Sequence, residues 1–147
     1  MLINSDFLLL IFKILHEIGM VLGFGGALFS SAILLHIKTN EVRLRRGRIA
    51  RRISILTWTG LVLLIISGIP LTVDYTAGYN ILLSAKHLCV TIVVVDAFII
   101  HFRLFPRYFR QIGTPDFDVT YSMMRRIGML SMACWISTFV LSAFLGG

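Results

Sequence analysis

The sequence predicts an all-α integral membrane protein with four helices in one domain, and three observations lead to this fold class. Hydrophobic residues make up 57% of the 147 residues and charged residues 14%, whereas soluble domains have about 45–50% apolar and about 25% charged residues. A soluble chain of this length could not bury so much apolar surface. The apolar residues form four runs, each meeting or exceeding the ~20 residues that a helix needs to cross a bilayer. These runs lack the alternation of barrel strands, so we expect helices.

The four expected spans form a bundle with antiparallel neighbours and cover about residues 7–37, 53–73, 81–105 and 123–145. The first run is longer than a bilayer requires, so we expect it to tilt or to project. The arginine-rich segment before the second run is expected to extend that helix beyond the membrane, and Pro70 is expected to kink it. Thr114 followed by Pro115 is typical of a helix cap and first helical position, so the fourth helix is expected to begin before its membrane part.

Basic residues are concentrated in two connections between the spans. Of the 14 Lys and Arg residues, 12 lie in segments 37–52 and 103–126, and segment 74–81 has none. Basic connections stay in the cytoplasm. We therefore expect a multi-pass protein of a bacterial-type inner (plasma) membrane, with both termini on the outer side. The formal net charge of +7 is then explained by topology and by anionic lipid headgroups as partners, and not by nucleic acid.

Ionisable side chains inside the spans are candidates for function because they are costly in lipid. They are Lys13, His16, Glu17, Lys86, His87, Asp96 and His101. Spans one and three run in the same direction, so the first five of these share the outer third of the membrane and are expected to form one polar cluster. Glu17 can pair with Lys13 one helical turn away, or with Lys86 across the bundle.

Histidine suggests a haem site, because imidazole is a usual axial ligand of haem iron and bundle interiors often hold the group. One b-type haem at the outer level is expected, with His16 and His87 as candidate iron ligands. His101 is a further cofactor-binding candidate, since it shares a helix face with His87. A two-haem arrangement is not expected, because His16 and His36 lie about 200° apart around their helix.

Each histidine also has a structural interpretation, and these alternatives stay open. His36 and His101 can be interfacial residues that contact headgroups, and His87 can be a boundary residue. His16 can be a packed, hydrogen-bonded histidine. Asp96 lies mid-span in "TIVVVDAFII", where a charge facing lipid is very costly. It is expected to be protonated, hydrogen-bonded to another helix, or part of a proton path.

Small residues form a stripe along the first span, at Gly19, Gly23, Ala27 and Ser30. Such stripes let helix backbones approach closely, either within the bundle or between copies in a homo-oligomer. In the alternative interpretation, Gly19 and Gly23 clear space for a flat cofactor and contribute to its site.

Three short motifs resemble the HemJ-type membrane protoporphyrinogen oxidases and the wider CopD-like group of four-helix membrane proteins. They are "LHEIGMVLGFGGALF" in the first span, "LTWTG" at residues 56–60 and "SAKHLCV" at residues 84–90. The resemblance implies haem b bound by His16, a functional lysine at Lys86, and oxidation of protoporphyrinogen as the activity. The chain departs from the family pattern at Gly23, where the family has Trp, and in "FSSA", where the family has an arginine.

The leading hypothesis is a haem-b-binding membrane protein that transfers electrons or oxidises a lipophilic partner, such as a quinone or a porphyrin. Lys86, Glu17 and Asp96 are its candidate catalytic residues, and the two carboxyl groups are expected to handle protons. One alternative is a cofactor-free membrane scaffold or accessory subunit, in which the outer cluster is an ion-pair network. The other is a CopD-like permease for a metal ion or small solute.

Overall fold

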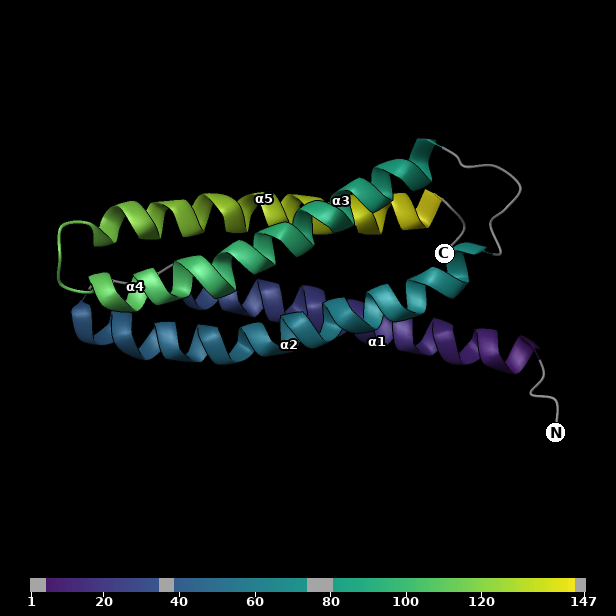
Figure 1. Ribbon diagram of the computed structural model, residues 1–147, viewed down its shortest axis with the longest axis horizontal. Coiled ribbons are helices and arrows are strands. Elements are labelled where there is room, and N and C mark those ends of the chain that lie inside the picture. Colours follow the sequence, from purple (N-terminus) through teal and green to yellow (C-terminus); the bar gives the residue numbers. More distant parts are fainter. Residues whose placement is uncertain (1–4, 35–38, 74–80, 145–147) are drawn as a thin grey trace.

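The computed structural model describes residues 5–34, 39–73 and 81–144, which form four long helical rods (Figure 1). Helix α1 is Ser5–Leu34, α2 is Asn40–Val73 and α5 is Phe117–Phe144. The third rod joins α3 (Ile81–Phe98), the π-helical segment η1 (Ile99–Leu104) and α4 (Phe105–Gln111). All four rods are long and apolar enough to cross a membrane. The predicted all-α, four-helix membrane fold is therefore confirmed.

The helix limits agree with several sequence predictions. Because α2 begins at Asn40, the arginine-rich segment is helical and continues into the second span. Helix α5 begins at Phe117, ahead of the apolar run, as Thr114 and Pro115 suggested. The prediction for His36 falls on residues 35–38, which lie outside the described residues, as do most of the connection 74–81 and the last three positions.

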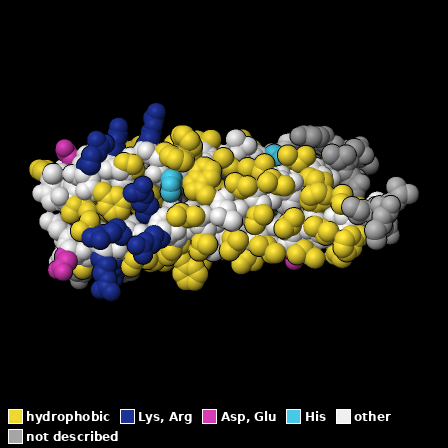
Figure 2. All heavy atoms as spheres, turned by 60° about the horizontal axis from the view of Figure 1, so that its bottom comes forward, with side chains coloured by type: hydrophobic (Ala, Val, Ile, Leu, Met, Phe, Trp, Pro, Cys, Tyr) yellow, Lys and Arg dark blue, Asp and Glu magenta, His cyan; other side chains and the backbone are white. Residues whose placement is uncertain are grey.

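The rods are arranged as two antiparallel pairs, α1 with α2 and α3 with α5 (Figure 1). Lys and Arg side chains gather at one end of the visible face, and hydrophobic side chains cover much of the rest (Figure 2). We call this the basic end, formed by the starts of α2 and α5 and by α4. The other end, where α1 and α3 begin, is called the terminal end. Exposed apolar side chains such as Val21 and Ile69 cover the rods between the ends, as a lipid-facing surface requires.

Glycines allow α1 and α2 to touch along their backbones. A Cβ atom placed on Gly60 of α2 would lie 2.6 Å from the carbonyl oxygen of Gly19 and 2.6 Å from Cα of Gly23. A Cβ atom on Gly26 would lie 2.6 Å from Oγ1 of Thr57. These distances leave no room for a methyl group at the crossing. The small-residue stripe of the first span is thus a packing surface within the molecule.

The π-helical segment η1 lies directly before Pro106. The backbone N–H of Phe105 donates to the carbonyl of Ile100, five residues earlier. Proline lacks an N–H, and in a regular α-helix its ring would clash with the carbonyl four residues before it, here that of Phe102. A wider turn at this point accommodates the proline and lets the helix continue as α4.

An aromatic cluster holds α4 against α2 and α5 at the basic end. Tyr108 and Phe117 are both buried, and their ring centroids lie 5.0 Å apart. The Tyr108 hydroxyl donates to the carbonyl of Arg43 at 2.9 Å. The guanidinium of Arg43 lies 4.0 Å from the centroid of the Phe117 ring and 3.5 Å from Asp118. One tyrosine therefore connects the two helix pairs.

Substitution of Tyr108 by phenylalanine is expected to lower the free energy of unfolding by about 0.5–1.5 kcal/mol, the usual net contribution of one hydrogen bond. The ring contacts remain, so the change isolates the bond to Arg43. Unfolding in mixed detergent micelles would measure it. Thr59→Val is the control, because Thr59 is exposed and bonds its own helix. An equal loss in both variants would contradict the assignment.

Candidate functional site

The side chain of His16 lies inside the bundle, between α1 and α2. Its Nδ1 atom is 3.1 Å from Oγ of Ser67, which is fully buried at 0% exposure. A Cβ atom on Gly68 would lie 3.6 Å from Cε1 of the ring. Lys86 of α3 is close enough for its charge to act on the imidazole. The ring is therefore half-buried and directed at neighbouring helices.

The contacts of Ser67 decide which nitrogen of His16 carries the hydrogen. The Ser67 hydroxyl donates to the carbonyl of Leu63 at 2.6 Å, and a hydroxyl has a single hydrogen to donate. Ser67 must therefore accept the Nδ1–H of His16, which leaves the lone pair on Nε2. A hydrogen bond that fixes the other ring nitrogen in this way is the usual arrangement around a metal-ligating histidine.

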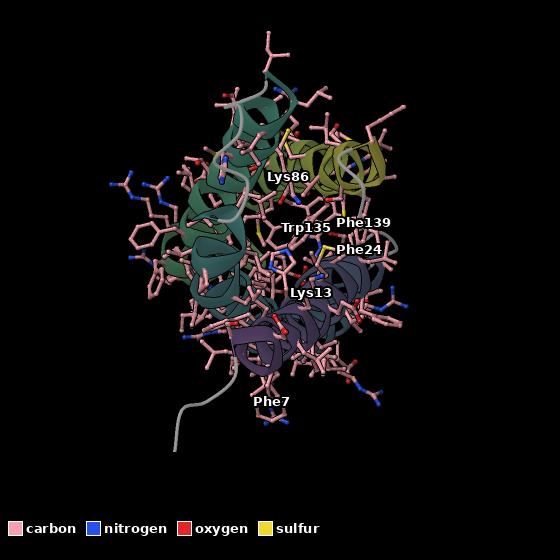
Figure 3. All side chains as sticks on the ribbon, turned by 90° about the vertical axis from the view of Figure 1, so that its right-hand side faces the viewer. Phe7, Lys13, Phe24, Lys86, Trp135 and Phe139 are labelled. Atoms are coloured by element: carbon pink, nitrogen blue, oxygen red, sulfur yellow. The ribbon has the colours of Figure 1, made fainter. Side chains whose placement is uncertain are left out.

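The remaining members of the predicted outer cluster lie around this histidine. Lys86 is half-buried, whereas Lys13, Glu17 and His87 are exposed. Figure 3 looks along the bundle from the terminal end, with Lys13 of α1, Lys86 of α3 and Trp135 of α5 labelled around its middle. His87 follows Lys86, and successive helical residues point about 100° apart.

Two ion pairs were considered for Glu17, with Lys13 or with Lys86, and neither is formed within 4 Å among the described residues. Among the described residues, the ion pair within 4 Å joins Arg43 to Asp118 near the basic end. Glu17 instead lies in the wall of an open hollow of about 410 Å³ between α1 and α5, whose other lining residues are apolar. The reason is helical geometry, because His16 and Glu17 are adjacent and cannot face the same neighbour. Lys13 likewise has no carboxylate partner in the described part of the chain.

Gly19 and Gly23 have a packing role in this structure. A Cβ atom on Gly19 would lie 3.0 Å from backbone atoms of Gly60 and Leu64. A Cβ atom on Gly23 would lie 2.9 Å from the ring of Trp135. The space that a flat cofactor would use beside these glycines is therefore filled by α2 and by an indole ring.

Asp96 is buried in α3, with 6% of its surface exposed. It lies near Cys134 of α5, so it faces the partner helix of its own pair. Its Oδ2 atom has no hydrogen-bond partner among the residues that the structure describes. The prediction that it avoids lipid agrees with this burial, and its role in proton transfer stays a prediction.

His101 is held in the same way as His16, although it was predicted only as a further cofactor-binding candidate. Its Nδ1 atom lies 2.9 Å from Oγ of Ser54, which donates to the carbonyl of Arg51 at 2.7 Å. The Ser54 hydroxyl donates its single hydrogen to this carbonyl, so it accepts the Nδ1–H of His101, and the lone pair of the ring is on Nε2. His101 also belongs to η1, and π-helical turns are frequent at functional sites. Two α2 serines thus orient histidines from two different helices at opposite halves of the bundle.

The arrangement fits one axial ligand of a haem better than a metal ion held by protein side chains alone. Across residues 5–34, 39–73 and 81–144, no three His, Cys, Asp or Glu side chains converge as metal ligands. Haem iron needs one or two protein ligands, so a single histidine such as His16 would be enough to hold it on one side. Comparison with protein-family models, curated proteins and solved structures gives no match.

Proposed function

We propose that the protein is a membrane haem protein that binds one haem b in the terminal half of the bundle, with His16 as an axial ligand. The observation that carries this proposal is the chain of hydrogen bonds from His16 through Ser67 to Leu63. It fixes the ring and leaves Nε2 with a lone pair inside the bundle.

The residues around His16 suit a porphyrin. Lys86 is half-buried on α3 near the ring, and an ammonium group there would pair with a porphyrin carboxylate. His87 stays the candidate for the second iron ligand. A bound haem would supply one-electron chemistry. The chain's own residues would position the group, exclude water and hold its carboxylates, and a quinone or a porphyrin is the proposed redox partner.

We also propose that the basic end faces the cytoplasm of a bacterial-type cell and contacts anionic headgroups. The gathering of Lys and Arg side chains at this end supports the orientation (Figure 2), because basic segments are retained on the cytoplasmic side. Both termini would then be on the outer side, together with the haem.

The visible spectrum tests the haem proposal directly. We expect protein purified in mild detergent from haem-replete cells to show a Soret band that shifts on reduction with dithionite. A folded, stable protein that stays colourless after haem is added would overturn the proposal.

Ser67→Ala is expected to weaken haem binding by about 10–100-fold, the usual effect of removing a group that orients a ligating histidine. The imidazole of His16 would still be present, but no hydrogen bond from Nδ1 to Ser67 would fix its tautomer. Titration of the apoprotein with haem would measure the dissociation constant. Ser54→Ala is the matched control, because Ser54 lies on the same helix and holds His101 instead. Equal affinities in the two variants would count against His16 as the ligand.

A second candidate function is a cofactor-free scaffold or accessory subunit, and the packing of Gly19 and Gly23 favours it. Both glycines are used to bring α1 against α2 and Trp135, so nothing about them requires a cofactor. Under this alternative the protein is stable and colourless, and Ser67→Ala changes only its stability.

A further inference from the structure

A small cavity in the basic half of the bundle is built by all four rods. Its volume is about 60 Å³, and its polar wall includes Ser31 of α1, Thr57 and Trp58 of α2, His101 of η1 and Ser131 of α5. It is therefore separate from the proposed haem position beside Ser67. Small-molecule sites usually measure about 300–1,000 Å³, so this cavity is too small for a tetrapyrrole or a quinone ring.

Two polar groups in the cavity wall lack protein partners. Thr57 is 8% exposed, and its Oγ1 atom is buried without a hydrogen bond to any described residue. The indole Nε1 of Trp58 is likewise buried and unpartnered in the described part of the chain. Leaving such a group without a partner costs about 1–3 kcal/mol. His101 also lines the cavity, and its Nε2 is an acceptor because Ser54 takes the Nδ1–H.

We propose that this cavity is an internal hydration site, in which bound water accepts from Trp58 and Thr57 and donates to Nε2 of His101. A water molecule needs at least about 10–15 Å³ of such volume and two to four polar partners, so the cavity is large enough for water. Water can pair with both the donors and the acceptor in the cavity wall, because its oxygen atom both donates and accepts hydrogen bonds. The bound water gives His101 a partner with which it can exchange a proton close to the basic end.

The chain contains a matched control for this proposal in its second tryptophan. Trp135 is 2% exposed, and its Nε1 is also buried without a partner among the described residues. Its surroundings differ, however, because it packs in an apolar cluster with Leu61, Leu64 and Val93. Of the two tryptophans, Trp58 lines the cavity with Thr57 and His101, and Trp135 does not line it.

Water-edited solid-state NMR on ¹⁵N-tryptophan-labelled protein in lipid bilayers separates the two indoles. We expect rapid magnetisation transfer from water to the indole N–H of Trp58 and slow transfer to that of Trp135, with Trp58→Phe assigning the signals. Equally slow transfer to both would show a dry cavity and overturn the proposal.

A cavity-filling variant tests whether the water is internal. Gly128 lines the cavity, and a Cβ atom on it would lie 3.7 Å from Ser31 Oγ, so Gly128→Val is expected to place methyl groups in the cavity. We expect it to reduce the transfer to Trp58 severalfold. Gly25→Val is the control, because a Cβ there meets nothing within 4 Å and Gly25 lines the other hollow. Unchanged transfer in folded Gly128→Val would overturn the proposal. If Gly128→Val does not fold, the comparison of water transfer to Trp58 and to Trp135 in the wild-type protein still tests the proposal.

Discussion

Gly60→Ala is expected to force α1 away from α2 and to lower the free energy of unfolding by about 1–3 kcal/mol, the usual cost of overpacking a filled interior. The new methyl carbon would lie 2.6 Å from the Gly19 carbonyl oxygen and 2.6 Å from Cα of Gly23. Both are backbone atoms, which cannot rotate aside as a side chain can. The loss should appear despite the better helix propensity of alanine, which alone would favour the variant by about 0.5–1 kcal/mol.

Denaturant titration in mixed micelles, followed by tryptophan fluorescence, would measure this change. Gly25→Ala is the matched control, because the same methyl group at that position meets nothing within 4 Å. The control is expected to be as stable as the wild-type protein or slightly more stable. Equal stabilities of the two variants would show that the backbones of α1 and α2 are not in contact at Gly60.

His16→Ala is expected to abolish the Soret band and to weaken haem binding by more than about 100-fold. Removal of a residue that only orients a ligating histidine weakens binding by up to about 100-fold, and removal of the ligand itself should cost more. Alanine offers no nitrogen to the iron, and the vacated space lies next to Ser67, whose hydroxyl is already committed to Leu63. Neither Ser67 nor Leu63 can therefore replace the missing ligand.

Matched variants at the other described histidines show whether the effect is specific. His101→Ala removes an imidazole with the same type of serine contact but in the basic half, so it should leave the Soret band unchanged. His87→Ala is expected to shift the band if His87 is the second ligand, and to leave it unchanged if water or Lys86 takes that position. A Soret band retained in His16→Ala would refute the assignment of the axial ligand.

The number of helices and the membrane fold could be predicted from the lengths of the apolar runs, because a long apolar segment in a bilayer must satisfy its backbone hydrogen bonds internally, as a helix does. The inward position of His16 also followed, since a histidine flanked by apolar turns is costly in lipid. Its contact with Ser67 could not be predicted. A lone serine in an apolar helix can bond its own backbone as readily as another helix, and the choice depends on how α1 and α2 rotate about their axes.

Two other features depended on tertiary geometry. Glu17 and Lys86 have opposite charges at similar depth, yet depth does not define the direction in which a side chain points. The environment of His101 depends on η1, and the signal in the sequence was Pro106 five residues later. Pro106 lies near the end of the third span, and the helix continues past it into α4 through the wider turn of η1.

The single π-turn has a consequence for how homologous or redesigned chains should be aligned. A π-turn holds more residues than an α-turn, so side chains after it lag behind the 100° per residue of a regular helix, and a helical wheel drawn from Ile81 onward misplaces the residues of α4. Tyr108, which donates to the carbonyl of Arg43, lies beyond this turn. Sequence variants that lack one residue between 99 and 104 are expected to replace the wide turn by a regular α-turn and to keep the same face of α4 against α2, so an alignment gap at this point does not imply a different helix packing.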